Sequence, residues 1–161
     1  MSSDTGAAAL PPLYHINAVV KDIDKTMEFL SLIWGLGPWQ VMEFTIDKDD
    51  LLVGEPCSIK LAGAKLGPTI LELIQPVVGR SIWSEFLETN GEGLHHIAFS
   101  VPNWDEMVSK LQEQGGRMVA GGFVDKKTGM RWCYFDTKPG GIVLEFEEKV
   151  EGRGPVLSFE P

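Results

Sequence analysis

One short pattern occurs twice in this sequence, and the repeat constrains the fold more than any other feature. Residues 13–16 read Leu-Tyr-His-Ile, and 81 residues later 94–97 read Leu-His-His-Ile. After each copy come a polar turn and then apolar residues at helical spacing. A supersecondary unit that occurs twice predicts two similar modules that bury their apolar faces together.

The ends of the two modules match as well. Residues 70–74, Ile-Leu-Glu-Leu-Ile, correspond to residues 143–147, Val-Leu-Glu-Phe-Glu, and loops of different length explain the changed spacing. We therefore predict an α+β fold, in which two tandem βαβββ modules form an open, cupped mixed sheet. Two of the expected strands begin at residues 13 and 94. The others are expected to span 39–44, 57–62, 69–75, 117–120, 131–136 and 142–147.

The expected domain spans residues 13–150, with modules at about 13–76 and 94–148 and a linking helix at 81–90. Residues 1–12 are small and polar, so a flexible segment is expected there. Residues 151–161 form a C-terminal tail that either docks on the domain or stays loose. The second module's helix is expected to start at Asn103, where Glu106 predicts a capping box.

Composition excludes several classes of partner. Fourteen basic and 23 acidic residues give a net charge of −9, which argues against nucleic acid and membrane-surface binding. Two cysteines cannot form a disulfide framework, so a reducing compartment is expected. No apolar run approaches the roughly 20 residues of a membrane span, and the first residues do not resemble a signal peptide. We therefore expect a cytoplasmic protein.

Each module has a histidine at the start of its first strand and a glutamate in its last strand: His15 and Glu72, then His96 and Glu145. A carboxylate inside an apolar strand is costly unless it is paired, protonated or bound to a cation. One such residue is usually structural, but four at matching positions indicate a shared partner. Two imidazoles and two carboxylates suit a divalent ion: Zn, Co, Ni, Mn or Fe. His95 is expected to be structural or to support the site.

Four segments carry a family resemblance: Tyr14-His15-Ile16, Leu-Glu-Leu-Ile-Gln-Pro at 71–76, Gly-Leu-His-His-Ile-Ala-Phe at 93–99 and Gly-Gly-Ile-Val-Leu-Glu-Phe at 140–146. With them the chain resembles the vicinal oxygen chelate superfamily of glyoxalase, bleomycin resistance and dioxygenase proteins, and most of all its methylmalonyl-CoA epimerase-like members. The resemblance implies that the same four residues bind a divalent metal. It also implies that a substrate chelates the metal through two oxygens and reacts through an enolate.

The implied activity is that of a metal-dependent isomerase, epimerase or lyase on a small carbonyl substrate, an acyl-CoA being one candidate, with Glu145 also acting as base. Epimerases carry a second carboxylate in the third strand of the first module. The expected register places Ser58 there, and a serine is a poor base without activation. Lys60 shares its face and could act instead if its pKa were depressed. Otherwise the enzyme removes and returns the proton on only one face of the substrate's acidic carbon, as an isomerase or lyase does.

The substrate pocket is expected to include Trp39 and Trp132 as walls, which would suit a ring-bearing substrate. Arg131 belongs to a basic group in the second module, which is either a solvated surface or a phosphate site for an acyl-CoA. The acidic charge of the chain counts against a polyanionic substrate. Small members of the superfamily often dimerise, so a homodimer is expected from the resemblance.

Two other functions remain open. One is a glyoxalase I-like lyase or a ring-cleaving dioxygenase. Facial-triad oxygenases use two histidines and one carboxylate, so the second carboxylate here argues against dioxygen chemistry. The other is a metal-free small-molecule binding or resistance protein. Oxygen consumption with Fe(II) would identify the oxygenase, and purified protein without metal would favour the binding protein.

Overall fold

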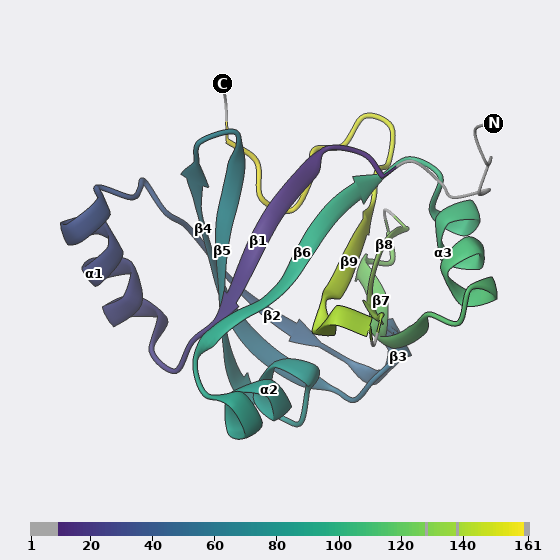
Figure 1. Ribbon diagram of the computed structural model, residues 1–161, viewed down its shortest axis with the longest axis horizontal. Helices are drawn as coiled ribbons and strands as arrows, with labels where there is room; N and C mark the ends of the chain where they lie inside the picture. Colours follow the sequence, from purple (N-terminus) through teal and green to yellow (C-terminus); the bar gives the residue numbers. More distant parts are fainter. Residues whose placement is uncertain (1–9, 128, 138, 160–161) are drawn as a thin grey trace.

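The computed structural model describes residues 10–127, 129–137 and 139–159. Figure 1 shows the helices arranged around one large sheet. The first module and the linking helix comprise β1 (Leu13–Val19), α1 (Ile23–Trp34), β2 (Gln40–Ile46), the 3₁₀ turn η1 (Lys48–Asp50), β3 (Leu51–Val53), β4 (Cys57–Leu66), β5 (Thr69–Val78) and α2 (Ile82–Asn90). The second comprises β6 (Gly93–Val101), α3 (Trp104–Glu113), β7 (Arg117–Asp125), β8 (Met130–Asp136), η2 (Pro139–Gly141) and β9 (Val143–Glu148). Within these ranges no helix is long and apolar enough to cross a membrane.

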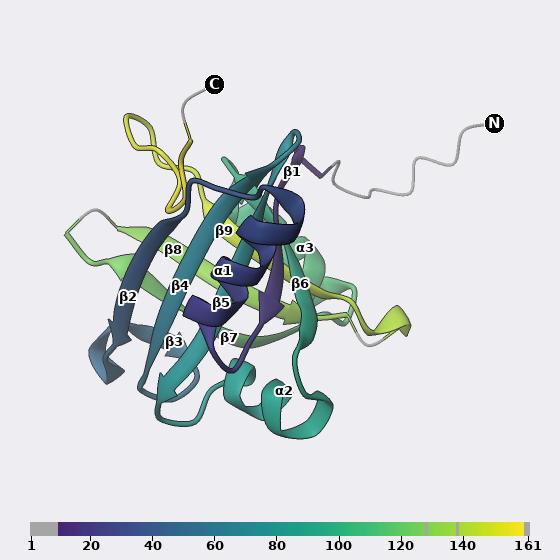
Figure 2. The ribbon, with the colours of Figure 1, turned by 90° about the vertical axis from the view of Figure 1, so that its left-hand side faces the viewer.

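The strands form one mixed sheet in the order β2-β4-β5-β1-β6-β9-β8-β7-β3. In each module the first strand runs parallel to the last, β1 with β5 and β6 with β9. The remaining strands of each module follow outward as antiparallel neighbours, in the same order in both modules. β1 and β6 pair antiparallel and join the two halves. The predicted α+β fold of two βαβββ modules in a cupped mixed sheet is confirmed (Figure 2).

The short strand β3 is an element that periodicity did not predict. It follows β2 in the chain but pairs with β7 at the far end of the sheet, Leu51 opposite Gly122. The two ends of the sheet are thereby brought together, and the sheet nearly closes. The close approach requires glycine at position 122, because a Cβ there would collide with the carbonyl oxygen of Asp50.

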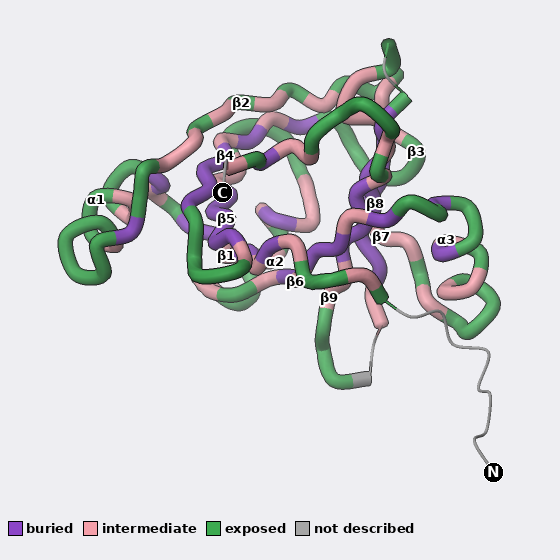
Figure 3. The backbone as a smooth tube through the Cα atoms, turned by 90° about the horizontal axis from the view of Figure 1, so that it is seen from above, coloured by how far each residue is buried: buried purple, intermediate pink, exposed green. Residues whose placement is uncertain are grey.

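The helices α1 and α3 lie outside the sheet, one beside each module (Figure 1). An apolar cluster packs between α1 and the first module, and a second one packs between α3 and the second module. A third cluster lies inside the cup and includes residues of α2. Figure 3 shows buried segments of the central strands around the interior, with α1 and most connecting turns exposed. The predicted capping box on α3 is wrong, because Asn103 makes no side-chain cap and instead donates from Nδ2 to Glu106 Oε2 at 3.3 Å.

The C-terminal tail docks on the domain. Leu157 is fully buried and belongs to the cluster inside the cup. The hydroxyl of Tyr14 donates to the carbonyl oxygen of Leu157 and accepts from its backbone N–H, both at 2.7 Å. Gly63 of β4 gives Leu157 room, since a Cβ at Gly63 would lie 2.6 Å from Leu157 Cδ1. Of the expected flexible segment 1–12, residues 1–9 lie outside the described ranges.

Candidate metal centre

Four buried side chains converge inside the cup: His15, Glu72, His96 and Glu145. One potential ligand atom from each lies within 4.8 Å of all the others. The Nε2 atoms of the two histidines are 3.2 Å apart, and Glu145 Oε2 lies 2.9 Å from both. Glu72 Oε1 is 3.5 Å from His15 Nε2 and 3.6 Å from His96 Nε2. The structure therefore brings together all four residues that the repeat singled out.

The central strands of the sheet position this cluster. His15 lies on β1 and His96 on β6, the two strands that join the modules. Glu72 and Glu145 lie on β5 and β9, the parallel neighbours of those strands. Side chains two residues apart along a strand share a face, so one histidine and one glutamate from each module reach the same interior.

The cluster is strongly coupled electrostatically. Burial opposes charge on His96, but the carboxylates of Glu145 and Glu72 outweigh burial and raise the pKa of His96 to about 9. The same two carboxylates raise the pKa of His15 against the effect of burial. Burial would raise the pKa of Glu145, but the two imidazoles hold it well below its ordinary value. The buried carboxylates thus require neighbouring positive charge, which a divalent ion would supply in place of protonated imidazoles.

The atoms around the cluster fit a divalent ion. Asn17 is fully buried on β1 and donates from Nδ2 to Glu72 Oε1 at 3.0 Å, which orients that carboxylate. His15 Nδ1 and Asn17 Oδ1 are buried and have no hydrogen-bond partner among the described residues. Two imidazole nitrogens and two carboxylates form a mixed set that suits Zn, Mn, Fe, Co or Ni.

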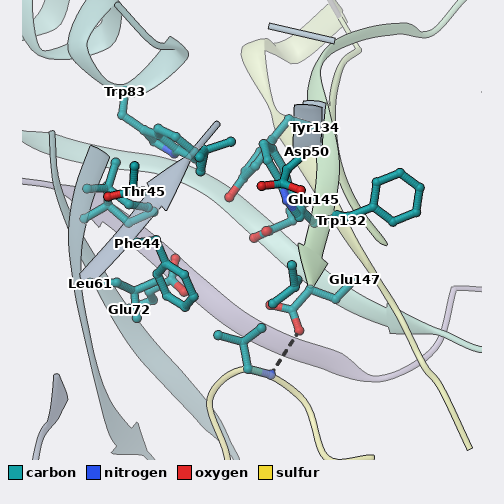
Figure 4. Close-up of a pocket in the computed structure, with 16 residues that line it drawn as sticks. Phe44, Thr45, Asp50, Leu61, Glu72, Trp83, Trp132, Tyr134, Glu145 and Glu147 are labelled. Carbon is teal, nitrogen blue, oxygen red and sulfur yellow. Dashed lines mark hydrogen bonds between the residues drawn. The ribbon is translucent and has the colours of Figure 1, made fainter. Parts of the chain in front are cut away.

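A cavity with an empty volume of about 620 Å³, including its open mouth, lies beside the cluster. Figure 4 shows Glu72, Glu145 and Glu147 with Trp83, Trp132 and Tyr134 around it. The rest of its wall comes from η1 and the tail and from strands of both modules, in Phe44, Thr45, Ile46, Asp50, Ile59, Leu61, Ile74, Phe123, Val124 and Val156. The cavity combines apolar walls with a few converging polar groups, as small-molecule sites do.

Of the residues predicted to form the substrate pocket, only Trp132 lines the cavity. The indole of Trp39 donates to Ser31 Oγ at 2.9 Å and packs beside α1, on the outside of the sheet. The guanidinium of Arg131 donates to Glu148 at 2.7 and 2.8 Å and to Asp105 at 2.9 Å. The charge of Arg131 is therefore matched by acidic side chains. The expectation that Trp39 and Arg131 line the pocket is corrected, because neither residue lines the cavity.

Ser58 and Lys60 do not lie at the cluster either. The cavity is lined from β4 by Ile59 and Leu61, so the alternation of the strand turns Ser58 and Lys60 to its opposite face. There the ammonium of Lys60 donates to both carboxylate oxygens of Asp24 on α1, at 2.8 and 2.7 Å. The proposed roles of Ser58 and Lys60 as second base depended on a register that the structure does not have.

Two residues at the site were not singled out from the sequence. Glu147 is buried in the cavity wall, and burial together with the charge of Glu145 raises its pKa to about 8. It lies two residues beyond Glu145 on β9, and that spacing was the signal that could have revealed it. The indole of Trp83 on α2 lines the cavity, and its Nε1 has no partner among the described residues.

His95 points away from the cavity but reaches the cluster through its neighbour. Its Nδ1 lies 2.9 Å from His96 Nδ1. The His95 ring also packs edge-on against Phe86 of α2, with centroids 5.0 Å apart. Burial and the neighbouring His96 lower the pKa of His95 to about 3, so its ring is neutral. This placement leaves both expected roles of His95, structural and supporting, open.

The fold and the buried histidine–glutamate cluster define a protein of paired βαβββ modules that encloses a candidate metal site. A comparison with protein families identifies the group: residues 14–134 match the model of the Glyoxalase/Bleomycin resistance protein/Dioxygenase superfamily. The chain belongs to this superfamily, as its resemblance to vicinal oxygen chelate proteins implied.

Two curated relatives match the sequence. The uncharacterized protein YqjC of Bacillus subtilis (strain 168) is 29% identical over 107 residues, covering 66% of this chain and 69% of the relative. The 2-epi-5-epi-valiolone epimerase of Actinomyces sp is 28% identical over 177 aligned positions, covering 92% of this chain and 88% of the relative.

Solved structures of methylmalonyl-CoA epimerases share the fold. The enzyme from Mycobacterium tuberculosis has a TM-score of 0.66 at 25% identity, covering 89% of this chain and 92% of that chain. A methylmalonyl-CoA epimerase in complex with methylmalonyl-CoA and NH4+ has a TM-score of 0.68 at 22% identity, covering 91% and 100%.

Proposed function

We propose that the protein is a metal-dependent isomerase or epimerase, which moves a proton at a carbon next to a carbonyl group. The observation that carries this proposal is the buried cluster of His15, Glu72, His96 and Glu145, with ligand atoms within 4.8 Å of one another. These four residues would hold the divalent ion. Its identity within the group Zn, Co, Ni, Mn and Fe is left to measurement.

The names of the relatives support this class of reaction. A curated relative that covers most of the chain is an epimerase, and so are several solved structures with the same fold. Their named substrates, 2-epi-5-epi-valiolone and methylmalonyl-CoA, differ greatly in size and charge. The relatives therefore support epimerisation as a reaction and leave the substrate of this chain to be argued from its own cavity.

The chemistry follows from the placement of the carboxyl groups. A divalent ion, when bound, polarises the carbonyl of a chelating substrate and makes the adjacent C–H more acidic. Glu145 faces the cavity and takes the proton from that carbon onto its carboxylate. Glu147 lies on the same face of β9 and lines the same cavity, where its carboxyl can hold a proton and return it. The aromatic and aliphatic walls exclude water while the carbanionic species exists.

Metal content is the first test. Elemental analysis of purified protein is expected to find about one divalent ion per chain. Solvent deuterium exchange, followed by NMR, is then screened over ketones, aldehydes and acyl-CoA thioesters. Glu145→Gln is expected to lower exchange by at least about 100-fold, the usual contribution of a general base. Glu113→Gln, on the exposed face of α3, is the matched control and should exchange like the parent.

Two results would overturn this proposal. Purified protein without metal, whose small-molecule binding is unchanged by chelators, would identify a binding protein. Full exchange activity in Glu145→Gln would remove Glu145 as the base. The four-donor cluster already disfavours the facial-triad oxygenase, which uses two histidines and one carboxylate; oxygen consumption with Fe(II) measures this directly.

A further inference from the structure

The charge and shape of the cavity point to a particular class of substrate. We infer that the site takes an uncharged, hydroxylated carbonyl compound with one apolar face, and that it disfavours substrates bearing carboxylate or phosphate groups. This inference rests on the proposed function, because it concerns the substrate of the same centre.

Acidic side chains dominate the polar part of the cavity. Asp50, Glu72, Glu145 and Glu147 line it, and no lysine or arginine occurs among the described residues that do so. A divalent ion would balance the charge of Glu72 and Glu145 only. Two carboxyl groups, Glu147 in the wall and Asp50 on η1, remain to meet the incoming substrate. A substrate carboxylate would be repelled by the carboxylate of Asp50 and would find no lysine or arginine among the described residues of the lining.

Two basic side chains that adjoin lining residues, Lys126 and Arg131, are already paired. The ammonium of Lys126, in the turn after β7, lies 3.6 Å from Asp50 Oδ1. Arg131, the arginine expected to face the substrate, is held by Glu148 and Asp105. Phosphate recognition relies on free arginine or lysine donors in fixed geometry. Neither residue offers such a donor without first breaking an ion pair.

Hydroxyl groups suit the same wall. The carboxyl oxygens of Glu147 and Asp50 are hydrogen-bond acceptors, and a hydroxyl group is the uncharged donor that matches them. Another part of the cavity wall is apolar, because the indoles of Trp83 and Trp132 both line the cavity. Their ring centroids lie 6.3 Å apart and their planes are inclined at 36°. Their faces favour an apolar surface on the ligand. A compact ring with hydroxyl groups and an exposed C–H face satisfies both walls.

The test compares two probes on the metal-loaded full chain. 2-Hydroxycyclohexanone is uncharged and has a hydroxyl group beside its carbonyl, whereas methylmalonyl-CoA carries a carboxylate and phosphates. Deuterium incorporation from D₂O is followed by NMR, and binding is followed by tryptophan fluorescence, since two tryptophans line the cavity. We expect 2-hydroxycyclohexanone to bind and exchange, with methylmalonyl-CoA weaker in both by at least about tenfold.

Removal of the charge of Asp50 gives a second measurement. Asp50→Asn removes one repelling carboxylate and releases Lys126, so the preference for the uncharged probe should fall by about threefold or more. The adjacent exposed residue provides the matched control, Asp49→Asn, which should keep the parent preference.

The outcomes separate this inference from the proposed function. Faster exchange or tighter binding of methylmalonyl-CoA in the parent overturns the inference and leaves the isomerase proposal standing. Selective binding of 2-hydroxycyclohexanone without exchange of either probe supports the inference and counts against proton transfer. Absence of binding by 2-hydroxycyclohexanone, or an equal effect of both variants, overturns the inference.

Discussion

The Nδ1 atoms of His95 and His96 lie 2.9 Å apart, although neighbouring residues of a strand normally point to opposite faces. Two ring nitrogens at this distance form one hydrogen bond, in which one nitrogen carries the proton and the other accepts it. His96 directs Nε2 at the cluster, so a metal there requires the proton of His96 on Nδ1. His95 Nδ1 then accepts that proton's hydrogen bond, and Phe86 holds the His95 ring from the other side. With a metal bound, His95 would therefore act as a positioning residue for His96.

Loss of this acceptor should weaken metal binding. His95→Leu is expected to raise the Kd of the divalent ion about 10- to 100-fold, the usual effect of removing a partner of a metal ligand. His95→Asn places an amide oxygen near the position of Nδ1 and should restore most of the affinity. Competition with a chromophoric chelator measures both Kd values. Equal losses in the two variants would show that His95 only fills space.

Asn17 is the corresponding support for Glu72. Its Nδ2 donates to Glu72 Oε1 at 3.0 Å in a fully buried position. Asn17→Leu removes that donor and leaves a buried carboxylate oxygen less satisfied, at a cost of about 1–3 kcal/mol in the free energy of unfolding. Urea denaturation of the metal-free protein measures the loss. The exposed residue at the end of α2 provides the control, Asn90→Leu, and an equally large loss there would contradict the argument.

A divalent ion should stabilise the folded protein by mass action. At a free concentration 100 times its Kd, an ion that binds only the folded chain adds about 2.7 kcal/mol. The melting temperature should therefore rise with added ion and fall again with a chelator. His96→Ala should lose this response, while Glu113→Gln on α3 keeps it. A melting temperature unaffected by Zn, Mn, Co, Ni and Fe(II) salts would argue against the metal centre.

The cluster could be predicted from the sequence because the repeat supplies two independent copies of one pattern. His15 and His96 correspond to each other, as do Glu72 and Glu145, and strand alternation places each pair on one face. The order of the main elements followed for the same reason, since each module is specified by local periodicity. Asn17 had no such signal, because its counterpart in the second module is Ala98.

Features that depend on distant contacts could not be predicted in this way. The register of β4 is set by its neighbours, and a shift of one residue exchanges Ser58 and Lys60 with Ile59 and Leu61. The three residues of β3 are a strand only because β7 lies beside them. The pairing of Arg131 with Glu148 likewise depends on how β8 and β9 lie together, which composition does not reveal.

The contact between Gly63 and Leu157 allows the docking of the tail to be tested. Leu157→Ala leaves a cavity inside the cup and should cost about 2–5 kcal/mol in the free energy of unfolding. Gly63→Ala places a Cβ 2.6 Å from Leu157 Cδ1 and should cost about 1–3 kcal/mol through overpacking. In the double variant the new methyl group enters the space left by leucine. The double variant should therefore lose less free energy of unfolding than the sum of the two single losses, by about 1 kcal/mol or more.

Leu32→Ala, on the exposed side of α1, controls for loss of the same atoms without burial. Strict additivity in the urea denaturation of the three variants would mean that the tail does not pack on β4 in solution.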